Sequence, residues 1–445
     1  MTFKISSIFH RQQEEPKIQF GRSGYTSPNP QIYRHWDNAV AFFENEKYLA
    51  SFKSILQFLH GKNPSVSFAE NGHRLQFSML HGSKIIFGHS NAKKFTAYAQ
   101  IVSVESLPSQ VAKTLLEINH HLEFCSYSID KDQCIMLRFE LCIEDASPYK
   151  IYNGLQELVF EADRQDDVLG NQYPELHPIN TYHVGAVSSK IASTKYEFLK
   201  AQIMEVEQDL KQLDAIKTTL PGAISYVLLD FFYSIDYLIK PQGKLMEHIK
   251  DVHDTFFSVN TMDVLQKNDA LLQTIQEIKD MDFDSFKREL YETYADFDQV
   301  NSFEPYSIQD VVKAQLKDLE WYKNNGYDIV SKAICGFIIG YSFYTLSLTP
   351  SLKSLLHTFY MVRYAHFFGE LGYHTSAYID KGNKLKLGKI NEYIKNGFNN
   401  EKNNWAVNVK KLKSQEIDRF YIEYVDMLAE MNFINPNSNS GRNVS

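Results

Sequence analysis

The chain has 445 residues, of which 44% are hydrophobic and 22% charged, and its formal net charge is −8. This length favours two or three domains, and the negative balance provides no overall field that would attract nucleic acid or anionic lipid. Four cysteines without a CxxC pair predict a reducing, cytoplasmic setting with no disulfide framework. The opening residues, MTFKISSIFHRQQEEPKIQF, lack the continuous apolar stretch of a secretory signal.

Residues 1–33 contain several prolines and show little periodicity, which predicts an extended arm. Apolar residues at helical spacing over 36–61 predict an amphipathic helix pair or one bent helix. HRLQFSML and KIIFGHS, separated by His81-Gly82-Ser83, have the pattern of a hairpin, and FTAYAQIVSV alternates as a third strand. A further helix is expected from a cap at Ser109 through His121.

The stretch LLEINHHLEFCSYSIDKDQCIMLRFEL, residues 115–141, changes from a helical period to strict alternation on either side of a polar turn. It predicts a helix that leads directly into a two-stranded hairpin, and another helix follows Pro148 and ends near Gly170. Runs of strands divided by helices favour an antiparallel α+β domain over residues 34–170. The aperiodic tract 171–187, with two prolines, is expected to be a linker.

Residues 188–434 are predicted to form an all-helical domain, and the polar tail 435–445 is predicted to be disordered. An apolar seam with spacings of alternately three and four residues fits either a coiled coil or a helical hairpin in a bundle. It consists of Tyr196, Leu199, Ile203, Val206, Leu210 and Leu213. The apolar stretches 221–239 and 333–348 are expected to be buried core helices, because the first contains two aspartates and the second is short for a membrane span. No transmembrane segment is therefore predicted.

Four segments together resemble the YbjN-type family, whose fold is that of type III secretion chaperones. They are the LLEIN helix end (115–119), the Tyr127–Asp130 strand end, the LRFEL strand (137–141) and the EADRQDDVL helix end (161–169). The resemblance covers about residues 36–170 and departs from the family at the doubled histidine and in the large helical region. It implies a protein-binding module that often dimerises and that has no catalytic residues.

The first hypothesis is therefore a non-enzymatic cytoplasmic adaptor or chaperone-like scaffold that binds a protein partner or client. The α+β domain would hold the partner, and the helical domain would supply assembly into a homo-oligomer. We expect the binding surface among apolar residues of the FFENEKYLASF helix and the LRFEL strand: Phe42, Phe43, Tyr48, Phe52, Leu137 and Phe139.

A second hypothesis is a metal-binding protein or metal-dependent enzyme in the helical domain. His366, Glu370 and His374 have i, i+4, i+8 spacing, which would place them on one face of a continuous helix. Two glycines in the same stretch weaken that helix. No nucleophile elbow, zinc-protease motif, phosphate-binding loop or dinucleotide fingerprint is present, so no enzyme activity and no cofactor are predicted.

Charge is unevenly distributed along the helical region. Residues 251–310 contain 14 acidic and 4 basic residues, whereas 381–413 contain nine lysines and two glutamates. The lysine-rich tract, with Lys410, Lys411 and Lys413 at its end, could contact a nucleic-acid backbone. Lysine without arginine suits that task poorly, so we favour a solvated surface or a partner for the acidic region, which makes head-to-tail assembly plausible.

Overall fold

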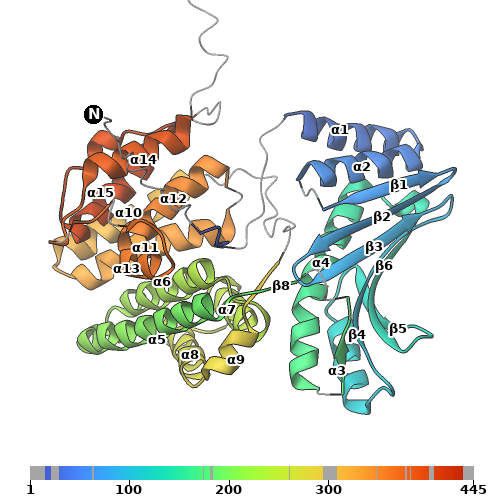
Figure 1. The fold of residues 1–445 in the computed structure, drawn as a ribbon, viewed down its shortest axis with the longest axis horizontal. Coiled ribbons are helices and arrows are strands. Elements are labelled where there is room, and N and C mark those ends of the chain that lie inside the picture. Colours follow the sequence, from blue (N-terminus) through green and yellow to red (C-terminus); the bar gives the residue numbers. More distant parts are fainter. Residues whose placement is uncertain are drawn as a thin grey trace, which may run out of the picture.

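The computed structural model describes residues 16–21, 30–62, 65–173, 175–180, 184–259, 261–293, 308–346, 348–375, 378–380, 382–399 and 405–433. An N-terminal antiparallel sheet with flanking helices is followed by a mostly helical region, which confirms the predicted fold class (Figure 1). We call residues 30–180 the α+β domain and 184–433 the helical domain. The predicted tail, 435–445, and residues 1–15 and 22–29 of the predicted arm lie outside the described residues.

The α+β domain begins with a pair of helices, α1 (Pro30–Glu44) and α2 (Tyr48–Lys62), so α1 starts inside the region predicted to be an arm. The sheet has the strand order β1-β2-β3-β4-β6-β5, with β7 (His177–Pro178) paired to β4. The strands on this path are β1 (Ser67–Asn71), β2 (Arg74–His81), β3 (Lys84–Ser90), β4 (Lys94–Ser103), β5 (Cys125–Ile129) and β6 (Cys134–Cys142). The two predicted hairpins, β2–β3 and β5–β6, are confirmed, and β1 is a strand that the sequence pattern did not indicate.

Two helices complete the domain, α3 (Ser109–Asn119) and α4 (Pro148–Gln172). The prediction that Ser109 caps α3 is wrong, because Pro108 occupies the cap position and no side chain caps the helix. α4 does have a cap, since the Ser147 side chain accepts a hydrogen bond from the Lys150 N–H at 3.3 Å. α4 lies along the sheet and buries Leu155, Leu158 and related residues against it.

The helical domain is a bundle in which α6, α11 and α12 form the centre. Its helices are α5 (Ser189–Gln212), α6 (Pro221–Ile239), α7 (Gly243–Phe257), α8 (Val264–Lys279), α9 (Phe283–Arg288), α10 (Ile308–Asn324), α11 (Asp328–Thr345), α12 (Pro350–Arg363), α13 (Ala365–Glu370), α14 (Leu387–Asn399) and α15 (Ile417–Ala429). Two short strand pairs, β8 (Gly185–Ala186) with β9 (Tyr291–Glu292) and β10 (Trp405–Ala406) with β11 (Asn432–Phe433), join distant segments. The predicted seam lies on α5, where Leu199, Ile203, Val206 and Leu213 are buried in the bundle core.

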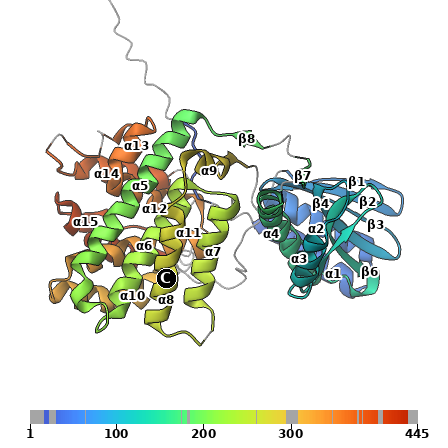
Figure 2. The same cartoon turned by 90° about the horizontal axis from the view of Figure 1, so that it is seen from below.

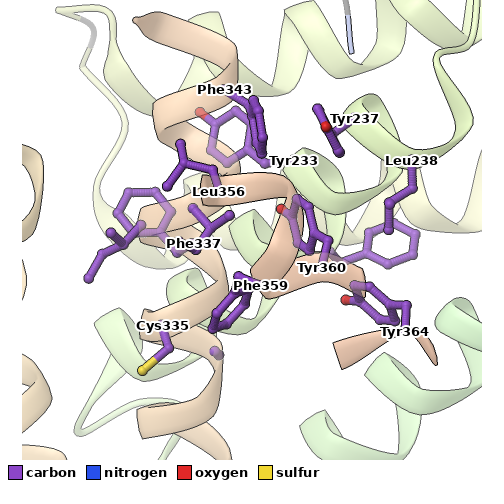
Figure 3. Packing of buried hydrophobic residues seen from close by; sticks show 14 of the residues in the cluster. Tyr233, Tyr237, Leu238, Cys335, Phe337, Phe343, Leu356, Phe359, Tyr360 and Tyr364 are labelled. Atoms are coloured by element: carbon purple, nitrogen blue, oxygen red, sulfur yellow. The ribbon is translucent and has the colours of Figure 1, made fainter. Parts of the chain in front are cut away.

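Aromatic residues dominate the centre of this bundle (Figure 3). The ring of Tyr237 on α6 stacks on Phe343 of α11, with centroids 3.8 Å apart, and on Tyr360 of α12 at 5.3 Å. The close approach of α11 to α6 depends on Gly336 and Gly340. A Cβ atom at Gly336 would lie 1.8 Å from Arg363 Nη1 and 2.0 Å from Asp230 Oδ1, which leaves no room for a side chain.

Both stretches expected to be core helices are buried, as predicted. Within the described part of the chain, α6 is the one helix long and apolar enough to cross a membrane by length and composition alone. In its apolar window 89% of the residues are buried inside the bundle, and the core helix of a folded domain passes the same test.

Residues 16–21 lie on the helical domain, although α1, the next described element, belongs to the α+β domain (Figure 1). Phe20 contacts the rings of Tyr237, His357, Phe368 and Tyr373, and the Gly21 N–H donates to the Tyr237 carbonyl at 2.8 Å. The chain therefore crosses between the domains twice, before α1 and after α4.

Candidate functional site: an acidic cavity between the domains

α4 of the α+β domain faces α7 of the helical domain (Figures 1 and 2). A cavity of about 520 Å³ lies at this boundary. This volume is within the range of small-ligand sites, which often form between domains. α4 supplies Glu157, Phe160, Glu161, Asp163 and Arg164 to its wall. α7 supplies Met246, Glu247, Lys250, His253 and Asp254, and Asp236, Tyr344 and Thr345 complete the lining.

Helical periodicity explains why these two helices present polar side chains to the same space. α7 buries Leu245, Ile249 and Val252 in the bundle, at intervals of four and three residues. Its neighbouring stripe, one residue further along, holds Met246, Lys250 and His253, and these three residues line the cavity. α4 is organised in the same way, since one stripe packs on the sheet and the next reaches the cavity.

The cavity wall is strongly negative. It contains six carboxylates and two cationic side chains, Arg164 and Lys250, which leaves a formal balance of −4 when the histidine is neutral. Burial lowers the pKa of His253, whose Nδ1 lies 2.7 Å from the Tyr233 hydroxyl, so His253 is uncharged at neutral pH. Burial, with help from Asp251 and Glu161, raises the pKa of Glu247 against the opposing effect of Arg164.

One arginine connects the two domains across this boundary. Arg164 Nη2 lies 2.7 Å from the Glu161 carboxylate on the same helix, and its Nη1 lies 3.7 Å from the Glu247 carboxylate on α7. The Arg164 side chain is 26% exposed, so the pair is only partly screened by water. Glu161 also accepts a hydrogen bond from the Tyr127 hydroxyl at 3.3 Å, which links the cavity to the sheet.

Glu157, at one end of the cavity, fixes the helix-to-hairpin stretch. Its carboxylate accepts three backbone hydrogen bonds, from Glu123, Phe124 and Cys125, at 2.7–2.8 Å. Asn119 adds a pair of hydrogen bonds with the backbone of Tyr127, at 2.6 and 3.3 Å. These contacts give Asn119 and Glu157 an evident structural role, while His120 and His121 are exposed beside them.

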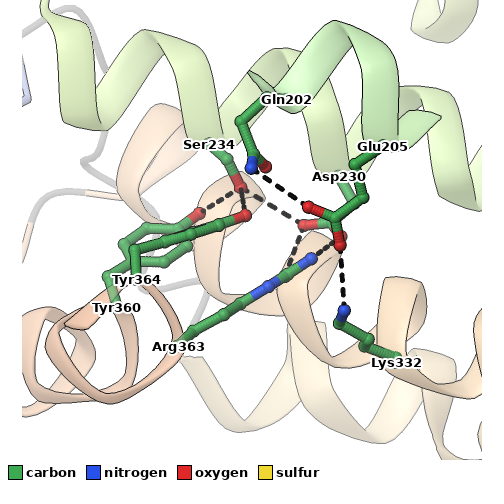
Figure 4. Close-up of polar contacts among 8 residues, drawn as sticks. All are labelled: Gln202, Glu205, Asp230, Ser234, Lys332, Tyr360, Arg363 and Tyr364. Carbon is green, nitrogen blue, oxygen red and sulfur yellow. Dashed lines mark hydrogen bonds and ion pairs between the residues drawn. The ribbon is translucent and has the colours of Figure 1, made fainter. Parts of the chain in front are cut away.

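A second polar cluster lies wholly inside the helical domain (Figure 4). The Arg363 guanidinium binds both carboxylate oxygens of Asp230, at 2.9 and 2.5 Å, and both side chains are less than a tenth exposed. Burial disfavours the charge on Arg363, but Asp230 outweighs it and holds the pKa of the guanidinium well above its usual value. Ser234 bridges Asp230 to the hydroxyls of Tyr360 and Tyr364, each at 3.3 Å. The two Nη atoms of Arg363, both Asp230 oxygens and the Ser234 hydroxyl all bond to neighbours inside the bundle, whereas Arg363 Nε is buried without a hydrogen-bond partner. Because these contacts are almost closed to solvent, we interpret the cluster as structural.

Three of the six residues predicted to bind a partner lie in the core of the α+β domain instead. Phe52, Leu137 and Phe139 are at most 1% exposed, because they face the core between the sheet and its helices. The alternation of LRFEL places Leu137 and Phe139 on the inner face, so they cannot contact a partner. Phe42, Phe43 and Tyr48 remain half-buried at the end of the α1–α2 pair, where the rings of Phe43 and Tyr48 lie 5.6 Å apart.

The geometry expected for the metal hypothesis does not form. α13 ends at Glu370, and Gly372, with a φ of +98°, turns the chain before His374, so the three residues do not share one helix face. Within the described ranges, no group of three or more His, Cys, Asp or Glu side chains is arranged to hold a metal ion. The two glycines noted in the sequence account for this early helix end.

Of the three lysines proposed for nucleic-acid contact, Lys410 and Lys411 lie in a short 3-10 turn, Val409–Lys411, that packs on α15, and Lys413 follows this turn. Lys411 forms an ion pair with Glu430, and the Lys413 backbone N–H donates to Glu423 at 2.6 Å. Lys410 and Lys413 have exposed side chains. The tract therefore contacts carboxylates on and directly after α15 of its own domain. Neither of these lies in the acidic region 251–310, so a contact between the two charged regions stays a prediction.

Comparison with known proteins adds no family assignment. No protein-family model matches the chain, and no curated protein matches it significantly. The resemblance to the YbjN-type domain stays a prediction.

Proposed function

We propose that this protein is a non-enzymatic adaptor that binds a partner protein, and that the cavity between its domains receives a lysine- or arginine-bearing segment of that partner. The observation that carries the proposal is the charge of the cavity wall, with six carboxylates against two cations around a space of about 520 Å³. A basic segment would complement this potential, and complementary charge steers association and specifies partners.

The chemistry of the wall suits a long basic side chain. Phe160, Met246 and Tyr344 provide apolar surface for the methylene groups of a lysine or arginine, while Glu247 and Asp254 lie close enough to the opening to keep 26% and 49% exposure. Long basic side chains bind in this way, with the stem on apolar surface and the head near carboxylates. The implied chaperone-like domain and the free thiols at all four cysteines also support an adaptor in a reducing cytoplasm.

Fluorescence anisotropy with a labelled tri-lysine peptide tests the proposal on the full-length protein. We expect saturable binding that weakens as salt is added, and no binding of a matched tri-glutamate peptide. The double variant Glu247→Gln/Asp254→Asn should bind about tenfold more weakly, since two lost charge contacts at partly exposed sites remove about 1.4 kcal/mol.

The matched control removes two carboxylates from a neighbouring helix that does not line the cavity. Asp269→Asn/Glu277→Gln on α8 changes the net charge by the same amount, so it should leave the affinity within about twofold of the unaltered protein. Equal weakening by both double variants would show that the peptide senses only net charge, and the assignment of the site would be wrong. Self-association lost on neutralising the lysine-rich tract would instead identify a second copy as the occupant.

A further inference from the structure

The segment 16–21 binds the helical domain as an extended peptide would bind a groove. Pro16, Ile18 and Phe20 are half-buried, while Lys17 and Gln19 are exposed, so alternate side chains point into the domain. Ile18 and Phe20 pack against the bundle core. This two-residue period is the pattern by which peptide-binding proteins read alternate side chains of an extended segment.

The groove takes an aromatic ring in a cage of four others. The centroid of Phe20 lies 5.3 Å from those of His357 on α12 and Phe368 on α13, and about 6 Å from those of Tyr237 and Tyr373. Aromatic pairs at these separations stabilise each other beyond the area they bury. Even so, Phe20 stays only half-buried, so its side chain is accessible at the surface of the domain.

The position after the phenylalanine requires glycine. Gly21 has a φ of +67°, and a Cβ atom there would lie 2.7 Å from Cδ2 of Tyr237. Its N–H donates to the Tyr237 carbonyl at 2.8 Å, and Lys240 Nζ donates to the Gln19 side chain, also at 2.8 Å. The groove thus selects an apolar residue, a phenylalanine two positions later and a glycine directly after it, and Lys240 can hydrogen-bond the side chain at the position between the first two.

We propose that this groove is a recognition site for an extended partner segment of the pattern apolar-x-apolar-x-Phe-Gly, and that residues 16–21 occupy it when the partner is absent. The segment belongs to no helix or strand, and two polar contacts together with one half-buried ring hold its C-terminal end. Segments held by few contacts open at low cost, so a partner can compete for the groove. The site lies apart from the acidic cavity and does not depend on the adaptor proposal, since it shares no lining residue with the cavity.

The test uses a labelled PKIQFG peptide and the full-length variant Phe20→Asp, whose own segment can no longer fill the cage. We expect this variant to bind the peptide at least tenfold more tightly than the unaltered protein, because tethering gives the native segment a high effective concentration. A PKIQDG peptide should bind neither protein. Lys17→Asp changes an exposed position of the same segment, so this control should behave as the unaltered protein.

A folded Phe20→Asp protein that fails to bind PKIQFG would overturn the proposal. If that variant does not fold, Phe20→Ala replaces it, and the same two outcomes apply. Light scattering tests whether the segment of a second copy of the chain occupies the groove instead. If the unaltered protein is a dimer and Phe20→Asp makes it a monomer, the groove binds the segment of a second copy, and the assignment to a partner is overturned.

Discussion

Replacement of Asp230 by asparagine should strongly destabilise the helical domain, because it leaves the Arg363 guanidinium charged and without its counter-ion. The two side chains share two hydrogen bonds at 2.9 and 2.5 Å, and they are 7% and 8% exposed. Water therefore cannot replace the lost carboxylate. Arg363 cannot relieve the loss by deprotonation, since an arginine stays charged in a protein.

Removal of one partner of a buried ion pair typically costs about 3–5 kcal/mol. The side chain of Asp230 also accepts a hydrogen bond from Ser234 at 3.3 Å, which an asparagine can keep, so we expect the lower part of that range. A loss of about 3 kcal/mol is a large share of the 5–15 kcal/mol that separates folded from unfolded domains. For a domain of this size it lowers the melting temperature by about 10 °C.

Differential scanning calorimetry of the full-length protein measures this change directly. The double variant Asp230→Leu/Arg363→Met removes both charges at similar volume and should recover most of the loss, because no unpaired charge is left in the core. If Asp230→Asn unfolds within about 1 kcal/mol of the unaltered protein, the pair is not the buried contact described here. A double variant as unstable as the single one would attribute the loss to packing rather than charge.

Three further changes test other parts of the structure by urea denaturation. The substitution Gly336→Ala should lower the free energy of unfolding by about 2 kcal/mol, because the added carbon would overlap the buried ion pair. The control Gly388→Ala, which has open space around its Cβ position, should be neutral or slightly stabilising. Equal effects of the two substitutions would contradict the packing of α11 on α6. Burial lowers the pKa of His357 to about 4. Below pH 6.5 this histidine therefore takes up a proton in the unfolded chain before it does so in the folded protein. Its contribution to the free energy of unfolding should fall by at most about 3 kcal/mol between pH 6.5 and 4. In the variant His357→Gln the free energy of unfolding should depend less on pH over this range. The same pH dependence as in the unaltered protein would show that His357 is not the group responsible. The substitution Leu137→Asp should unfold the α+β domain, because Leu137 is buried in its core. His121 is exposed, so His121→Ala should change the free energy of unfolding by less than about 0.5 kcal/mol. A stable Leu137→Asp protein would show that the strand register is wrong.

The sequence predicted which segments form helices and strands better than it predicted which face of each element is buried. Alternation in LRFEL correctly indicated a strand, but the pattern alone did not say which face was buried, and the partner surface was therefore assigned to Leu137 and Phe139, which lie in the core. β1 was missed because its residues are mostly exposed and do not alternate. The histidine spacing of 366–374 predicted a shared face only on condition that the helix continued, and the glycines ended it.

The acidic cavity was out of reach of sequence reasoning for a different reason. Its two main helices, Pro148–Gln172 and Gly243–Phe257, are far apart in the sequence. Glu247 belongs to no recognised motif, and Glu161 belongs only to the helix end that resembles the YbjN-type family, a resemblance that implies no site there. Each helix shows a polar stripe beside its apolar stripe, and such a stripe normally faces solvent. Only the packing of one domain on the other brings the two stripes together. The excess of acidic residues after position 251 was a partial signal, since Asp254 lies in the cavity wall.

Photo-crosslinking can locate a basic partner segment bound between the two domains. A tri-lysine peptide that carries a benzophenone group would be irradiated with the full-length protein, and the modified residues mapped by mass spectrometry. We expect modified residues on α4 and α7, with Met246 as a preferred acceptor, and we expect the modification to disappear at high salt. Modification spread over the exposed acidic residues of α8, with none on α4 or α7, would contradict it.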